Sequence, residues 1–504
     1  MFKHYKILKI TLNILLITLI LLSNSIGVFA FDPSVKINIY SSSDTETRSQ
    51  IDVIPVRNTN YISFYVDKYS WDRMSSSDQY KITDFSSVLS SEFEYKIYPK
   101  IVQALPNISQ WLNIQKKLIV VLTPMSNNIQ GYIRWDDFNS FSQSRTSNDG
   151  NIIYLNSKNI LNSNFSNNVL YSFFIHELMH LISFREKTVN YNAEEETWLE
   201  ELRSEYLVHY LGYNQNKDSY LNFRLQNGLS LTDVNLTNWN NNNNSYALIN
   251  LLGIYLSQRF SPAIIFNTLT SKLSGVESIN NFLSEHGYKE RFSDVFQDWI
   301  IANILNNCSI NSNYCYKNLD IHINTPGASF FLPLNNDTTL STSDSLISYQ
   351  AKYQKIVGGS SFLEITLENT KNNIFQKIPY ILITQNGEKI LKFFEFNNEM
   401  IQRININDYS KQYSNVILIP MLVSNDTNNQ LIKWHITSTK VSNAVKPIVR
   451  TTTSTSKEET AIAPTSTTSK PDFGNASPIV INIIPPQKAS FITKFLIFFE
   501  SFFQ

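Results

Sequence analysis

The sequence predicts an α+β domain, with a mixed sheet and a helical part, followed by an all-β domain of the sandwich type. Strand-like runs and helically spaced apolar residues occur up to about residue 305, and short alternating runs replace them from about residue 320 to 443. Asn386-Gly387 stands between two of these runs and is a strong hairpin signal. Because 504 residues exceed what one hydrophobic core usually supports, we expect more than one domain.

The composition argues against partners that need a strong charge. Lys and Arg total 42, as do Asp and Glu, so no global field favours a nucleic acid. With 13 glycines in the whole chain, glycine-rich phosphate loops are scarcely available.

The first thirty residues resemble a secretory signal peptide. Three lysines precede an apolar run at 10–22, and small residues stand at the usual cleavage positions at 28–30. The alternative is a membrane anchor, but the run is shorter than the ~20 residues that a span needs. We therefore predict a secreted protein cleaved after Ala30.

The α+β domain is expected over residues 59–318, after an N-terminal extension at 31–58 that could act as a short prosegment. A helix should begin after Ser75, with Asp78 three residues later, and run to about residue 105. The strand predicted at 151–155 could be a sheet edge that pairs with an extended peptide, or another core strand. The strand-like runs lie at 61–67, 117–123, 131–135 and 151–155.

Residues 174–180 read Phe-Ile-His-Glu-Leu-Met-His. His176 and His180 are four residues apart, so on a helix both imidazoles can reach one metal ion, with Glu177 beside them. The surrounding residues are apolar, and two buried histidines need a partner. A histidine pair that faces solvent or is satisfied in the core is the alternative. Zinc in catalytic sites takes three protein ligands and leaves a position for water, whose proton Glu177 could take.

A second helix supplies the candidate third ligand. Leu199, Leu202 and Tyr206 are helically spaced, and Glu201 and Glu205 share another face of this helix. This spacing suits Glu201 as the zinc ligand and Glu205 as the acceptor for a ligand histidine's other ring nitrogen. A solvated acidic helix start is the alternative, and it accounts best for residues 194–196.

The HELMH motif, followed by the run WLEELRSEY at 198–206, resembles the gluzincin metallopeptidases, in particular secreted bacterial enzymes similar to hyicolysin. The resemblance covers about residues 61–305. It implies a zincin-like fold, in which a mixed sheet and an active-site helix precede a helical subdomain. It further implies Zn²⁺, a protein or peptide substrate, and Glu177 as general base.

Two positions depart from the gluzincin pattern, because Glu200 stands where asparagine is usual and Leu202 where glycine or alanine is usual. Glu200 would restore the thermolysin-like spacing, but it is turned ~100° away from Glu205 on a helix, so Glu201 is preferred.

Gluzincins usually supply a tyrosine or histidine to the oxyanion. Tyr246 is the candidate here and His209 the second, and an ordinary core tyrosine is the alternative for Tyr246. Helical patterns in this part of the chain lie at 245–260, 261–272, 275–284 and 290–305.

The predicted β-sandwich covers residues 319–443. Its role could be carbohydrate binding, protein binding or that of a spacer, since the fold alone decides nothing. Its seven strand-like runs lie at 329–335, 346–357, 361–369, 379–385, 388–396, 415–423 and 431–439.

Cys308 and Cys315 are the only cysteines, and export makes a disulfide between them the expected state, with two free thiols as the alternative. Residues 444–476 are rich in Thr, Ser and Pro and are predicted to be a linker. The tail at 477–504 ends in an amphipathic segment of ~21 Å, too short to span a bilayer. It could contact a membrane interface, act as a sorting tag, or dock on the protein.

Together these observations predict a secreted or surface-attached zinc endopeptidase. The alternative is a catalytically idle zincin scaffold that acts as a surface binding protein through its β-sandwich. Retention of every expected site residue, Glu177 and Glu205 included, favours the enzyme.

Overall fold

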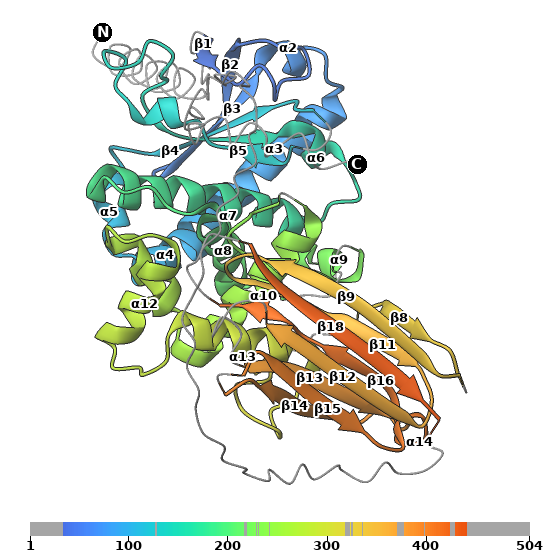
Figure 1. Cartoon of the computed structure of the whole chain (residues 1–504). Helices are drawn as coiled ribbons and strands as arrows, with labels where there is room; N and C mark the ends of the chain where they lie inside the picture. Colours follow the sequence, from blue (N-terminus) through green and yellow to red (C-terminus); the bar gives the residue numbers. More distant parts are fainter. Residues whose placement is uncertain are drawn as a thin grey trace, which may run out of the picture. The chain divides into compact units, whose positions relative to one another are not determined.

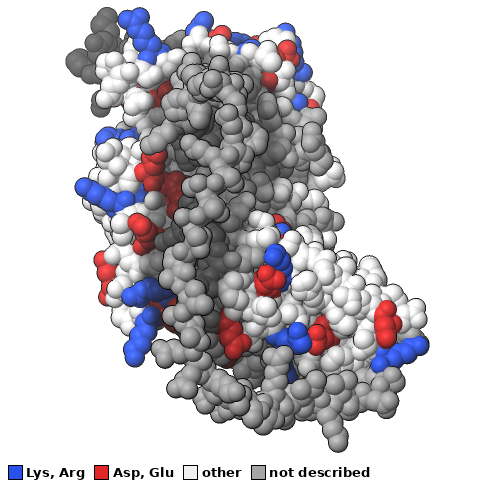
Figure 2. Space-filling view, in the orientation of Figure 1, with Lys and Arg blue, Asp and Glu red and all other residues white. Residues whose placement is uncertain are grey.

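The computed structural model of the chain (Figure 1) describes residues 34–440, apart from 127–128, 216–218, 228, 230, 241, 318–322, 324–325, 335, 370–376, 398 and 424–428. The signal peptide predicted at 1–30, the linker at 444–476 and the tail at 477–504 lie outside the described residues. None of the helices described is both long enough and apolar enough to cross a membrane. On the face drawn in Figure 2, basic and acidic side chains are interspersed.

The chain divides into two compact units. The described residues up to Ala193, together with Arg203–Tyr220, form the first unit. Glu194–Leu202 and the described residues from Leu221 onward form the second. The division passes through helix α8 (Thr197–Leu211), whose first six residues belong to the second unit.

The first unit is built on a six-stranded mixed sheet with the strand order β1-β2-β3-β4-β6-β5. β3, β4 and β6 are parallel to one another, whereas β1, β2 and β5 run antiparallel to their neighbours. The strands are β1 (Val35–Asn38), β2 (Gln50–Asn58), β3 (Ile62–Asp67), β4 (Leu118–Thr123), β5 (Gly131–Tyr132) and β6 (Asn151–Asn156).

The structure decides one open alternative about this sheet and corrects the bounds of one strand. The strand predicted at 151–155 is β6, which pairs with β4 on one side and β5 on the other, so it is not an edge. The edge strand beyond β6 is β5, which is shorter than the run predicted at 131–135, and a 3-10 helix begins at Trp135.

The described residues of the range 31–58 belong to the first sheet and do not form a separate extension. They supply β1 and β2, and β2 pairs along β3 with an irregularity between Pro55 and Arg57. β3, with which β2 pairs, lies beyond the predicted boundary at residue 59. Composition alone does not reveal this pairing.

Helix α3 begins as the sequence predicts. The Ser75 hydroxyl accepts the backbone N–H of Asp78 at 3.1 Å, which satisfies one of the free donors at a helix start. The helical path continues through a π-helical turn and ends at Ala104, close to the predicted residue 105. The first unit contains α2 (Lys68–Trp71), α3 (Ser76–Glu92), η1 (Phe93–Ile97), α4 (Tyr98–Ala104), α5 (Ile108–Trp111), η2 (Trp135–Phe138), α6 (Ser157–Leu161), α7 (Asn167–Ser183) and η3 (Phe184–Val189).

The helices of the second unit after residue 242 lie close to their predicted ranges, whereas α9 (Tyr220–Asn227) was not predicted. The Asn242 side chain caps α10 by accepting the Ser245 N–H at 2.9 Å. The run predicted at 261–272 is divided into a short α-helix and a 3-10 turn. The helices are α9 (Tyr220–Asn227), α10 (Asn243–Phe260), α11 (Ala263–Phe266), η4 (Asn267–Thr270), α12 (Gly275–Glu285) and α13 (Phe292–Leu305).

The strands of the second unit form two larger sheets that share one apolar core. The five-stranded sheet has the order β14-β13-β16-β11-β8 and the four-stranded sheet the order β15-β12-β18-β9. One buried cluster contains residues of both sheets: Ile365 and Trp434 of the four-stranded sheet, and Tyr380 and Leu382 of the five-stranded sheet. The bounds are β8 (Ala328–Leu332), β9 (Thr338–Leu346), β11 (Gln354–Gly358), β12 (Phe362–Asn369), β13 (Lys377–Thr384), β14 (Lys389–Glu395), β15 (Ile401–Ile406), β16 (Tyr413–Leu418) and β18 (Gln430–Thr439), with the short helix α14 (Tyr409–Gln412) before β16.

The hairpin predicted at Asn386-Gly387 is confirmed. β13 and β14 pair antiparallel on either side of it, and Gly387 adopts a φ of 88°, which glycine tolerates best. β9 and β15 are not among the predicted strands. β9 reads Thr-Thr-Leu-Ser-Thr-Ser-Asp-Ser-Leu, too polar to be recognised by an apolar alternation.

A third, small sheet links the helical part of the second unit to its later strands, because β7 lies between α9 and α10 in the chain. β10 (Gln350–Lys352) lies between β17 (Met421–Leu422) and β7 (Asp233–Asn235). The Tyr353 hydroxyl also donates to the carbonyl of Ile300 at 2.8 Å. Helices after residue 221 and strands after residue 319 therefore lie in one compact unit, which differs from the predicted boundary at 318.

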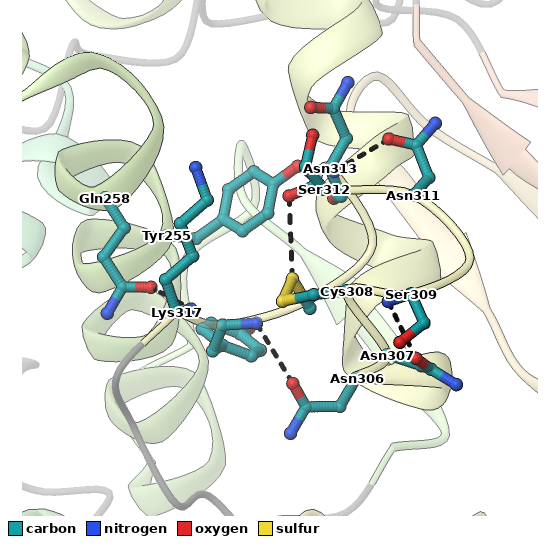
Figure 3. Close-up of a disulfide and its surroundings, with 12 residues drawn as sticks. Tyr255, Gln258, Asn306, Asn307, Cys308, Ser309, Asn311, Ser312, Asn313 and Lys317 are labelled. Carbon is teal, nitrogen blue, oxygen red and sulfur yellow. Dashed lines mark hydrogen bonds between the residues drawn. A yellow bond between two sulfur atoms is a disulfide. The ribbon is translucent and has the colours of Figure 1, made fainter.

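Cys308 and Cys315 form a disulfide in the segment after α13, with Cα atoms 5.1 Å apart (Figure 3). Both cysteines of the chain are in this bond. The Tyr255 hydroxyl donates to the carbonyl of Asn313, and the Gln258 side chain accepts the backbone N–H of Lys317, each at 2.7 Å. The disulfide loop is thus held against α10.

The loop between β1 and β2 is held by a buried ion-pair network. Arg48 donates to Asp44 at 2.7 Å and to Asp67 at 3.1 Å, and both carboxylates are almost fully buried. Burial raises the pKa of Asp44, but the hydrogen bonds from Arg48 outweigh this and hold the pKa below its ordinary value. Asp44 therefore stabilises the fold above about pH 4, and this stabilisation is lost as the pH falls through its folded-state pKa.

We predict that Arg48→Ala lowers the free energy of unfolding by about 3–5 kcal/mol at pH 7, because two buried carboxylates lose their counter-charge. The measurement is urea denaturation of the full chain. Lys81→Ala, which removes an exposed pair with Asp78, is the control and should leave the midpoint almost unchanged. Equal midpoints for Arg48→Ala and the control would show that the network does not stabilise the fold.

Candidate metal centre

Helix α7 places the HELMH residues in a buried environment. Most of its residues from Val169 to Ser183 are buried, which fits its apolar composition. His180 is 3% exposed and Glu177 7%, while the His176 side chain is 14% exposed. Polar groups at this depth must be satisfied by hydrogen bonds or by a ligand.

The two histidine rings are oriented from α8. His176 Nδ1 lies 3.3 Å from Glu205 Oε1, and His180 Nδ1 lies 3.3 Å from Ser204 Oγ. A carboxylate only accepts hydrogen bonds, so the His176 Nδ1 that faces Glu205 is a donor, and a neutral ring then keeps its lone pair on Nε2. The Nε2 atoms of the two rings face each other at 3.1 Å.

Glu201 completes a cluster of three donor groups. One nitrogen from each histidine and a carboxylate oxygen of Glu201 all lie within 4.8 Å of one another. Glu201 is 1% exposed. Glu200, the alternative ligand considered from the sequence, is also buried but does not belong to this cluster.

The donor set fits a zinc ion. Two imidazole nitrogens bound to one zinc at 2.0–2.1 Å lie about 3.3 Å apart at the tetrahedral angle. The observed separation of the Nε2 atoms is 3.1 Å. Two imidazoles and one carboxylate are also a ligand set that zinc prefers in catalytic sites.

Glu177 lies against the edge strand β5. A Cβ atom on Gly131 would stand 2.9 Å from Glu177 Cγ and 2.9 Å from the carbonyl oxygen of Tyr154. Only glycine therefore allows β5 to approach α7 this closely. The neighbouring Tyr132 ring stacks on Tyr154 with centroids 4.7 Å apart. The sequence analysis did not single out Gly131, although an isolated glycine in a strand indicates a close approach.

Ser204 is a second residue to which the sequence analysis assigned no role. It stands directly before Glu205 in the run at 198–206, and the two side chains contact different histidines. Its helical position three residues after Glu201 was the signal available in the sequence.

The oxyanion candidates lie outside the three-donor cluster. Tyr246, on α10 in the second unit, is 1% exposed. Its ring meets Trp239 edge to face at 5.3 Å, with the Arg224 guanidinium 4.5 Å from its centroid. His209 Nδ1 lies 3.0 Å from Asn214 Oδ1, and burial lowers the pKa of His209. A role of either residue at an oxyanion stays a prediction.

Of the acidic residues before α8, Glu194 is exposed, as expected for a solvated helix start, whereas Glu195 and Glu196 are partly buried. Glu195 accepts the Gly275 N–H at 2.6 Å, and Glu196 accepts the Trp198 indole N–H at 2.6 Å. Burial raises the pKa of Glu196 above its ordinary value, against the lowering effect of the Trp198 hydrogen bond. Glu195 and Glu196 thus form contacts within the second unit, and α8 begins directly after them, at Thr197.

Comparison with known proteins does not assign a family. No family model matches the chain, and no curated protein matches it. The pre-peptidase C-terminal domain of a collagenase from Bacillus anthracis aligns with 13% identity over 22% of this chain and 99% of its own, with a TM-score of 0.17. The SPBc2 prophage-derived protein YomS aligns with 12% identity over 21% of this chain and 99% of its own, with a TM-score of 0.15. A family GH115 4-O-methyl-α-glucuronidase aligns over 56% of this chain and 39% of its own, with 11% identity and a TM-score of 0.12. At these scores the similarities carry no argument about fold or function.

We predict that Glu201→Gln abolishes stoichiometric zinc binding, whereas Glu200→Gln retains it. Only Glu201 has an oxygen within the three-donor cluster, and a neutral amide is a poor replacement for a carboxylate ligand. Zinc content after dialysis of the purified full chain is the measurement. Loss of zinc in Glu200→Gln with retention in Glu201→Gln would reverse the ligand assignment.

Glu205→Gln should weaken zinc affinity about 10- to 100-fold without removing a donor atom, because it loosens the orientation of His176. Competition with a chromogenic chelator measures the affinity. Asp298→Asn, in an ion pair of the second unit with Arg259, is the control and should leave zinc affinity unchanged.

Proposed function

We propose that the chain is a zinc-dependent peptidase of the gluzincin type, secreted or attached to the cell surface, with its metal ligands on α7 and α8. The observation that carries the proposal is the convergence of donor atoms from His176, His180 and Glu201 within 4.8 Å. The peptide bond is the substrate group that the HELMH motif suggests.

The residues of α7 and α8 divide the work. A zinc ion held by this cluster supplies Lewis acidity and a water of lowered pKa. His176 and His180 present their Nε2 atoms, and Glu205 and Ser204 fix the ring orientations through Nδ1. Preorganised ligands of this kind need no rearrangement during the reaction.

Glu177 is the proposed general base. Its side chain lies beside Gly131 at a buried position of α7. In the proposed reaction it removes the proton from the attacking water and returns it to the leaving amine. Proton transfer by a positioned carboxylate contributes about 10²- to 10⁴-fold to the rate.

The edge strand β5 is the proposed contact for the substrate backbone. It pairs with β6 on one side, and it ends the sheet on the other. An extended peptide can add to such an edge through backbone hydrogen bonds. The closeness of Gly131 to Glu177 supports this placement, since the same strand then lies beside both the substrate backbone and the base.

The first test is zinc content and casein hydrolysis by the full chain, with and without a chelator. We expect stoichiometric zinc and activity that the chelator abolishes. Glu177→Gln should bind zinc like the wild type but lose hydrolysis by about 10²-fold or more. Glu94→Gln, a carboxylate that accepts the Tyr61 backbone N–H, controls for a nonspecific effect of losing a glutamate.

Unchanged hydrolysis in Glu177→Gln would overturn the role of the base. Bound zinc without turnover of casein or gelatin would favour the idle scaffold instead. Absence of zinc from the wild-type protein would contradict the metal centre altogether.

A further inference from the structure

The second unit contains a polar cavity of about 420 Å³ at the start of α10. Its walls come from β7, from the segment that leads into α10, and from the chain around β10. It shares no lining residue with the cluster of His176, His180 and Glu201. Its volume lies within the range of small-molecule sites, about 300–1,000 Å³.

Hydrogen bonds stabilise the floor of the cavity, which is formed by the paired strands β7 and β10. β7 pairs with β10, so that Asn235 lies opposite Gln350. The Gln350 amide donates to both carboxylate oxygens of Asp233, at 2.8 and 3.0 Å. Farther along, the Thr237 hydroxyl donates to the carbonyl of Ser348 at 2.7 Å. The floor is therefore formed before any ligand arrives, which lowers the cost of binding.

The segment that leads into α10 is held as well. Asn235 Oδ1 accepts the Asn238 N–H at 3.0 Å, and Asn242 caps α10. Trp239 lines the cavity, and its ring is positioned by the edge-to-face contact with Tyr246. The indole thus presents an apolar surface among side chains that are mostly amides.

The lining chemistry selects a neutral ligand rich in hydroxyl groups. Side chains of six asparagines and one glutamine line the cavity, and amides both donate and accept hydrogen bonds. No Lys, Arg or His is among the described lining residues, so no cationic side chain of this lining attracts an anion. Asp233 is the one ionisable lining residue, and both of its oxygens already accept from Gln350.

We propose that this cavity binds a neutral saccharide, with Trp239 against the apolar face of a sugar ring and the amides bonded to its hydroxyls. The second unit would then hold the protein on a neutral glycan, independently of the metal centre. This binding requires neither zinc nor Glu177.

The test is binding of the full chain to an array of immobilised neutral oligosaccharides built from hexoses and N-acetylhexosamines, with sialylated and sulfated glycans as the charged comparison. The best neutral glycan is then titrated in solution by calorimetry. We expect Trp239→Ala to weaken binding by about tenfold or more, the loss of one good contact. Phe331→Ala, which removes an exposed aromatic side chain from β8, is the matched control and should bind like the wild type.

Asn238→Ala combined with Asn240→Ala tests the amides without disturbing the fold, because both residues are exposed. This variant should also weaken binding. The Glu177→Gln variant and the chelated protein should bind the glycan normally, so failure of the peptidase proposal would leave this result intact. No retention on any neutral glycan, retention unaffected by Trp239→Ala and the double variant, or retention on charged glycans alone would each overturn the proposal.

Discussion

The main constraint on this structure is the burial of polar side chains on α7. An apolar helix gains stability when it is surrounded by the core, but His176, Glu177 and His180 are carried into the core with it. The Nδ1 atoms of His176 and His180 contact Glu205 and Ser204, respectively, which lie on α8 about one helical turn after Glu201. The buried histidines of α7 therefore depend on the sequence of α8, because without the contacts to Ser204 and Glu205 the imidazoles would be buried and wrongly oriented.

Helix α7 also packs closely against the sheet of the first unit. β5 passes beside Glu177 only because Gly131 has no side chain, and this strand ends the sheet. The proposed base thus lies next to the strand at this edge of the described sheet. In the second unit, the pairing of β7 with β10 joins the helices to the strands and also forms the floor of the polar cavity.

Local signals in the sequence predicted many elements well. The cap at Ser75, the hairpin at Asn386-Gly387 and the helical runs of α7, α10 and α13 depend on residues within a few positions of one another. The polar strand β9 lacks such a signal, and β1 and β2 join the sheet only through the pairing of β2 with β3. Strand pairing is a non-local property, so composition describes it poorly.

The sequence by itself determined which side chains can share a helix face, because helical spacing is set by the backbone: His176 with His180, and Glu201 with Glu205. Only the tertiary structure decided that Glu201 rather than Glu200 joins the histidines, that Ser204 contacts His180, and that β5 rather than β6 is the edge strand. These outcomes depend on how separate elements pack, since a rotation of one helix or a change in strand order would alter them without altering any local pattern.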